Sequence, residues 1–245
     1  MIIGKSDRNC EVFDVLLLVF RNVETFIVPF FIKHISSYAF IESISIPKHA
    51  RIIGEEAFSR CYRLKKDDFH DDSELEIIES DAFGDPFIES ISIPAKVERL
   101  SDGWCMRTPK LTKVTINPGN KHFQCLDPKH QTIGLNDNAF EEAIFASRDI
   151  KSAAIPSFIK RIKPFSFFEC ESIKTVSFTE SSSLESIEKE SFSYLSIEKV
   201  IIPKEVTQIG ESAFSFCDKL KTVEFQKNSK LTVIKQRCLF LFFSA

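Results

Sequence analysis

The feature of this sequence that most constrains its fold is an internal repeat. Its two best copies, residues 41–64 and 197–220, align without a gap and are identical at 13 of 24 positions. Residues 13–40 also align without a gap with residues 140–167. A unit of this length cannot bury its own apolar side, so neighbouring copies must stack on one another. The sequence therefore predicts a repeat solenoid.

Apolar residues in each copy follow a fixed order that predicts a short strand and then a buried turn. Ile44 and Ile46 alternate with serines, which is the period of a strand with one buried face. Pro47 ends the strand, because proline has no N–H to donate to a ladder. In the Gly-Glu-x-Ala-Phe segment that follows, Ala57 and Phe58 are expected to cover the core from a short helical or 3-10 turn.

Phenylalanine is the residue that the repeat uses most. The chain holds 25 Phe but one Trp and three Tyr. The turn position recurs as Phe40, Phe58, Phe83, Phe167, Phe192 and Phe214. The last three are 25 and 22 residues apart, within the 20–29-residue period of leucine-rich repeats. Units with proline after the strand alternate with units that have a polar loop there, as in 73–83, 182–192 and 229–239.

The pattern I-x-I-P-x-x-[VI]-x-x-I-G-x-x-A-F-x-x-C-x-x-L resembles the BspA-type leucine-rich repeat family. Residues 140–170 also resemble the longer units of that family in parasitic protists. The resemblance implies a right-handed α/β solenoid with short parallel strands on the concave side and short helical or 3-10 turns behind them. It also implies a surface-antigen-like or scaffold protein, related to adhesion, with no catalytic residues to carry over.

The repeats predict a single solenoid domain, 1–245. Recognisable units cover about 13–116 and 140–239, and 117–139 is expected to be an irregular or hairpin-like insertion. Asp67, where a buried Val or Ile is expected, predicts one degenerate unit, and Trp104-Cys105 in place of Ala-Phe predicts a bulge or a repacked core. The end, LFLFFSA, lacks a polar capping unit and is expected to be truncated or covered by a partner.

The cysteines and the apolar runs bear on localisation. Seven cysteines without a CxxC pair favour a reducing compartment. Residues 12–20 are apolar like a signal peptide, but Asp14 interrupts them and their alignment with mid-chain residues indicates a repeat unit. No apolar run is long enough to span a bilayer. We therefore expect a cytoplasmic chain without a transmembrane segment, while the family resemblance keeps the cell surface open.

Candidate catalytic and metal-binding residues are few. The histidines, 34, 49, 70, 122 and 130, lie at different repeat positions without a GxSxG or phosphate-binding loop, so neither an enzyme nor a cofactor is predicted. A loose metal-like group, His122-x-x-Cys125 with His130, is more simply a polar loop. Cys61, Cys170 and Cys217, each three residues after a turn Phe, are expected in the core rather than in redox chemistry.

The remaining candidate site is the outward row of the predicted strands. The formal net charge of −3 gives no general reason to bind nucleic acid. The candidate ligand face contains Thr25, Ser43, Ser45, Ser90, Ser92, Lys113, Thr115, Ser152, Thr175, Ser177, Lys199, Thr222 and Glu224, with Ile201 beside them. Such hydroxyl-rich strips suit a protein or glycan ligand, although Ser and Thr also suit any exposed strand.

These observations predict a non-catalytic binding protein that uses an extended repeat surface for protein–protein or host-surface recognition. Two alternatives stay open. One is an intracellular scaffold or adaptor, and the other, from another class, is a hydrolase that uses the His and Cys residues of the insertion.

Overall fold

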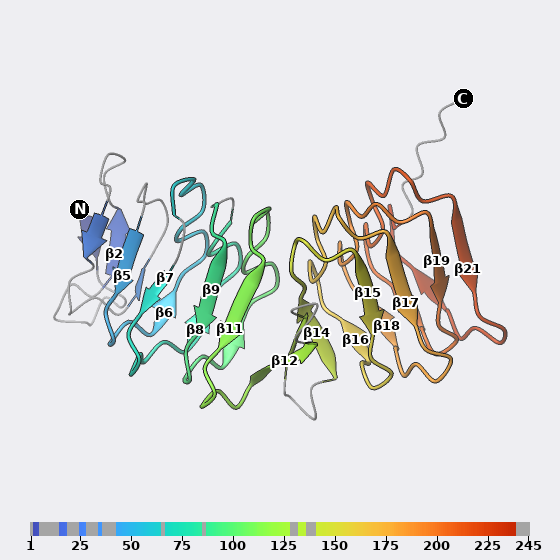
Figure 1. The fold of residues 1–245 in the computed structure, drawn as a ribbon, viewed down its shortest axis with the longest axis horizontal. Coiled ribbons are helices and arrows are strands. Elements are labelled where there is room, and N and C mark those ends of the chain that lie inside the picture. The colour runs from blue at the N-terminus through green and yellow to red at the C-terminus, as the bar shows by residue number, and fades with distance from the viewer. Residues whose placement is uncertain are drawn as a thin grey trace. The chain divides into compact units, whose positions relative to one another are not determined.

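The computed structural model describes residues 2–4, 15–18, 25–27, 34–35, 43–64, 67–84, 87–127, 132–135 and 141–238. They belong to two compact units, Met1–Phe123 and Gln124–Ala245 (Figure 1). Within each unit the chain winds in coils of roughly two dozen residues, and each coil contributes one long and one short strand. The prediction of a leucine-rich-repeat solenoid is confirmed. Whether one solenoid domain runs through both units stays a prediction.

The long strands form the first set of parallel ladders, and they carry the predicted alternation. In unit 1 they are β3 (Thr25–Ile27), β5 (Ser43–Ile46), β7 (Asp67–Phe69), β9 (Ser90–Ile93) and β11 (Lys113–Ile116). In unit 2 they are β15 (Ser152–Ile155), β17 (Thr175–Phe178), β19 (Lys199–Ile202) and β21 (Thr222–Phe225). Ile91, Val176 and Val200 are buried on three of these strands, as their period-two pattern predicts.

Two-residue strands form a second set of parallel ladders that the sequence reasoning missed. In unit 1 these are β4 (His34–Ile35), β6 (Ile52–Ile53), β8 (Ile77–Ile78) and β10 (Arg99–Leu100). In unit 2 they are β16 (Arg161–Ile162), β18 (Ser186–Ile187), β20 (Gln208–Ile209) and β22 (Val233–Ile234). Ile53 and Ile209, predicted to point inward, are fully buried here. The core of each unit therefore lies between its long and its short strands.

The predicted short helical or 3-10 turns behind the strands are not found: no helix is assigned in the part of the chain that the structure describes. Residues 54–61 instead alternate between two kinds of hydrogen bond. Phe58 N donates to Ala82 O of the next coil at 2.7 Å, whereas Cys61 N donates back to Phe58 O at 3.1 Å. Glu56 and Arg60 take positive φ angles of 55° and 61°, which an α-helix does not allow.

The same turn recurs in unit 2 and stacks directly on its neighbours. Phe167 N donates to Ser191 O, Phe192 N to Ala213 O and Phe214 N to Cys238 O, each at 2.9 Å. Left-handed residues are unfavourable for L-amino acids, but here they turn alternate N–H groups toward the next coil, where backbone carbonyls accept them. Hydrogen bonding between coils, rather than within a helix, thus sets the conformation of this segment.

Buried phenylalanine rings follow the turns in a stack, which explains the surplus of this residue. In unit 2 the ring centroid of Phe192 lies 5.0 Å from that of Phe167 and 5.4 Å from that of Phe214. In unit 1 the corresponding distance between Phe58 and Phe83 is 5.2 Å. All five rings are buried, as predicted, and aromatic pairs at such distances add to the stability gained from burial alone.

Two predicted departures from the repeat can be followed in unit 1. Trp104 and Cys105 are both buried, and the Trp104 ring meets Phe83 edge-on with centroids 6.3 Å apart, so the core repacks around the larger ring. Despite Asp67, β7 forms and pairs in parallel with β5, with Asp67 opposite Ile44.

Residues 117–139, the predicted insertion, include β12 (Phe123–Asp127) and β13 (Thr132–Leu135). β13 pairs antiparallel with β14 (Glu142–Phe145), which begins the parallel short-strand ladder of unit 2. β1 (Ile2–Gly4) pairs in the same way with β2 (Val15–Leu18) in unit 1, and both pairs contain a register shift. A corresponding antiparallel pair thus precedes the short-strand ladder of each unit, although the gapless alignment of 13–40 with 140–167 does not extend to β1 and β13.

Candidate ligand-binding face

The outward residues of the long strands lie in register from one coil to the next. Ser92 stands opposite Thr115 in unit 1, and in unit 2 Ser152 stands opposite Thr175 and Lys199 opposite Thr222. Parallel strands lie about 4.8 Å apart, so such pairs form continuous rows of neighbouring side chains. Most of the predicted face is solvent-exposed: Ser92, Lys113, Thr115, Ser152, Thr175, Ser177, Lys199, Thr222 and Glu224.

Four residues of the predicted face differ from this description. Ser45 and Ser90 are half-buried. The strands that carry Thr25 and Ser43 are described, but their side chains lie outside the described part of the structure. Whether any of these residues contacts a ligand stays a prediction.

The long-strand rows are interrupted at one place in each unit. β7 and β9 belong to separate sheets, and so do β17 and β19, whereas the short-strand ladders run on past both places. The described long strands of each unit therefore form two separate ladders.

The length of the chain between the turn and the next strand explains the interruptions. At both of them, the buried strand residue follows the turn Phe by eight positions: Ile91 after Phe83, and Val200 after Phe192. Across the paired strands β15–β17 and β19–β21 the same interval is nine positions. One residue fewer shortens an extended chain by about 3.3 Å, so the next strand starts out of line with its neighbour.

Proline removes a hydrogen bond at the same places. Across two of the paired ladders, the residue after the later strand donates to the end of the earlier one: Asn117 N to Ile93 O at 2.9 Å and Gln226 N to Ile202 O at 3.0 Å. The equivalent donor from β19 to β17 would be residue 203, which is proline. At the interruption before β9, that position is Pro94.

A groove with a volume of about 720 Å³ lies at the interruption between β17 and β19. Its lining comes from both strands and the segments beside them: Lys174, Thr175, Val176, Ser177, Phe178, Glu180, Ser196, Glu198, Lys199, Ile201, Lys219 and Gln226. It includes Thr175, Ser177 and Lys199 of the predicted face. Sequence reasoning missed the groove, although the eight-residue interval and Pro203 were the signals that could have revealed it.

The predicted core cysteines are confirmed. Cys61 and Cys170 are fully buried, and Cys217 is nearly so. Burial raises the pKa of the Cys217 thiol to about 11, and that thiol donates to Phe192 O at 3.1 Å. Burial also raises the pKa of Cys170, against the opposing charge of Arg148. Since a raised pKa keeps a thiol protonated, these side chains act as packing groups.

The loose metal-like group of the insertion is only partly described. His122 is half-buried and Cys125 is exposed, whereas His130 lies outside the described residues. Across the residues that the structure describes, no three His, Cys, Asp or Glu side chains come together as a group able to hold a metal ion.

The repeat profile named BspA type Leucine rich repeat region matches six copies, over residues 19–125 and 138–242. Together these two ranges cover most of the chain. The chain belongs to the BspA-type leucine-rich repeat family.

Solved structures with the same fold include bacterial leucine-rich repeat proteins. A leucine rich cell surface protein from Faecalibacterium prausnitzii A2-165 matches with a TM-score of 0.57 and 18% identity, over 84% of this chain and 69% of that one. A leucine-rich repeat protein from Bacteroides ovatus ATCC 8483 matches with a TM-score of 0.56 and 21% identity, over 90% and 64%. At these identities the likeness shows the fold alone. A search of curated proteins gave no match.

A helix long and apolar enough to cross a membrane is not found among the described residues of this BspA-type chain.

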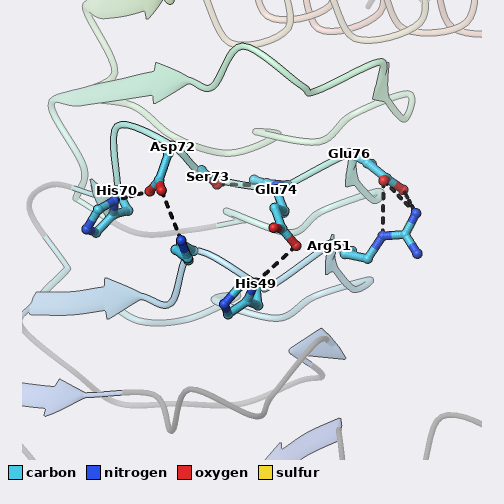
Figure 2. A network of polar contacts seen from close by, with 9 residues as sticks. His49, Arg51, His70, Asp72, Ser73, Glu74 and Glu76 are labelled. Carbon is cyan, nitrogen blue, oxygen red and sulfur yellow. Dashed lines mark hydrogen bonds and ion pairs between the residues drawn. The ribbon is translucent and has the colours of Figure 1, made fainter.

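Ion pairs tie neighbouring coils together along a loop edge of unit 1, as Figure 2 shows. Arg51 contacts the carboxylate of Glu76 through two nitrogens, with Nε–Oε1 at 3.0 Å and Nη2–Oε2 at 2.8 Å. His49 Nδ1 lies 3.2 Å from Glu74 Oε2. The charges of Arg51 and Glu76 neutralise one another across the coil boundary, and an exposed pair of this kind contributes little to stability.

Two lysine–carboxylate pairs predict a measurable pH effect. The hydrogen bond from Lys48 Nζ, at 3.1 Å, lowers the pKa of Asp72 from 3.8, and the one from Lys230 Nζ, at 2.6 Å, lowers the pKa of Glu205 from 4.5. In both cases the carboxyl pKa is lower in the folded state than in the unfolded state. Each pair therefore stabilises the fold at pH values above the ordinary carboxyl pKa. That contribution is lost as the pH falls through the lowered pKa. Carboxyl-carbon NMR titration should show the Asp72 midpoint rising in Lys48→Met and the Glu205 midpoint rising in Lys230→Met, each toward its ordinary value; unchanged midpoints would contradict the assignment.

Proposed function

We propose that this chain recognises a protein ligand, without catalysis, through the outward side chains of its long strands. The observation that carries the proposal is the register of exposed residues, such as Ser92 opposite Thr115 and Lys199 opposite Thr222. A solenoid gains a large contact area by repeating modest local contacts, and stable interfaces need about 800 Å² on each partner. The hydroxyl-rich surface and the groove within it support binding rather than chemistry.

Membership of the BspA-type family supports the same proposal. One structural neighbour is a leucine rich cell surface protein, and we extend to this chain a recognition role at a cell surface, including adhesion to a host. We also propose that residues 140–170 are related to the longer repeat units of family members from parasitic protists.

An intracellular scaffold is the second candidate, favoured by the buried thiols of Cys170 and Cys217. Labelling intact cells with a membrane-impermeant biotin reagent separates the two locations, because only a surface protein reacts before lysis.

Affinity capture with two matched variants tests the proposal. The face variant places arginine at Ser92, Thr115, Ser152 and Thr222, all exposed on long strands. The control variant places arginine at Ser181, Ser229, Thr232 and Gln236, which are exposed elsewhere. We expect proteins captured by the wild type to be retained by the control and lost by the face variant. Equal capture by both variants would argue against this face.

A further inference from the structure

We propose that the groove between β17 and β19 binds an extended acidic segment of the protein partner, with an apolar side chain of that segment seated against Ile201. This inference rests on the proposed function, because it assigns one site within the same face. The volume of the groove, about 720 Å³, is within the usual range for ligand sites, about 300–1,000 Å³.

The groove offers an apolar contact where the face is otherwise polar. Ile201 lies in the outward row, where the next strand carries Glu224 opposite it, yet 43% of its surface is exposed. Phe178 lines the same groove and is half-buried. Covering the exposed parts of these side chains would contribute about 25 cal/mol for each Å² of apolar surface removed from water.

Three lysines and two glutamates, Glu180 and Glu198, line the groove, and the end where its strands begin favours an acidic partner. Lys199 Nζ is held by Glu224 at 2.6 Å, and Glu198 faces Lys221 at 3.5 Å. In contrast, the ammonium groups of Lys174 and Lys219 form no ion pair with any residue that the structure describes. Both lysines come just before a long strand, so unneutralised positive charge gathers at the end of the groove where the strands begin. Carboxylates of a bound segment would face this end.

The chemistry of the groove favours a peptide over a sugar. Sugar rings pack best on flat aromatic faces, whereas the most exposed apolar group here is the branched aliphatic side chain of Ile201. The edges of β17 and β19 that face each other are also not joined in one sheet, and unpaired strand edges offer backbone donors and acceptors that a peptide can use.

The test uses the full chain, labelled with ¹⁵N, and two pools of capped heptapeptides. The acidic pool has a central Leu, Ile or Val flanked by Asp and Ser; the basic pool has Lys in place of Asp. The proposal predicts that the acidic pool alone shifts the amide signals of Ser177, Lys199 and Ile201. It also predicts that Lys174→Glu with Lys219→Glu weakens binding of the acidic pool by about tenfold and creates binding of the basic pool.

A control variant separates local charge from net charge. Lys204→Glu with Lys235→Glu makes the same change at exposed lysines that do not line this groove, and should leave binding of the acidic pool intact. Equal loss in both variants, no shift from either pool, or shifts from a neutral oligosaccharide alone would each overturn the proposal.

The two proposals fail separately. If the face variant loses its captured proteins while the charge reversal at Lys174 and Lys219 changes nothing, the face binds a partner but the groove does not. If the acidic pool binds the groove while the face variant keeps every captured protein, recognition is confined to the groove and the extended-face proposal fails.

Discussion

Replacement of Phe192 by alanine is expected to lower the free energy of unfolding by about 3–5 kcal/mol, the usual cost of removing a buried aromatic ring. Phe192 is fully buried and lies between Phe167 and Phe214 in the ring stack of unit 2. The substitution removes ring contacts on both sides, and the stacked backbones keep the neighbouring coils from collapsing into the space. Urea unfolding followed by circular dichroism measures the effect.

Phe225→Ala is the matched control for this prediction. Phe225 ends a long strand with 42% of its surface exposed. Removing its ring should therefore lower the free energy of unfolding by less than about 1 kcal/mol. A similar loss in both variants would mean that the ring stack has no special part in holding the coils together.

A second large effect is expected in unit 1, where Trp104→Ala should lower the free energy of unfolding by about 3–5 kcal/mol. Trp104 takes the alanine position of the turn and is nearly fully buried against Phe83. Adding Cys105→Phe should recover a substantial part of the loss, because the double variant restores the Ala-Phe pair that other coils use. The unfolding free energies of the wild type, both single variants and the double variant form a thermodynamic cycle.

One outcome of this thermodynamic cycle would contradict the prediction for Trp104 and Cys105. Cys105→Phe alone overpacks the turn beside Trp104 and is expected to destabilise the chain by about 1–3 kcal/mol. If the costs of the two single substitutions simply add in the double variant, the two positions do not share one core site, and the repacking inferred for this turn is incorrect.

The strands and the buried ring positions could be predicted because their signals are local. Alternation at Ile91 and Ile93 fixes which side chains face inward, and a recurring Phe spacing fixes the coil. The burial of Cys61 and Cys217 could be predicted from the same repeat spacing. Each of these predictions needs only the period of the side chains and the need to bury apolar surface.

The turn conformation and the short strands could not be predicted in this way. Gly-Glu-x-Ala-Phe suits a helical turn by spacing, and the alternative depends on carbonyls of the next coil, such as Ala82 O for Phe58 N. Two-residue strands such as β6 have no period to detect. They exist because a neighbouring coil supplies the partner.

The candidate face was predicted as rows of outward residues, but its interruption was not. The missing residue between Phe192 and Val200 is visible in the sequence, yet its effect depends on where the strand of the preceding coil lies. The groove and the open charges of Lys174 and Lys219 therefore emerge only once the coils are stacked.

Couplings transmitted through hydrogen bonds, measured by NMR on the labelled chain, test most directly that the coils are held together by their stacked turns. The structure predicts a coupling from Phe192 N to the carbonyl of Ala213, and equivalent couplings from Phe167 N to Ser191 and from Phe214 N to Cys238. A coupling from Phe192 N to the carbonyl of Glu188, four residues earlier, would instead reveal a helix and contradict the account.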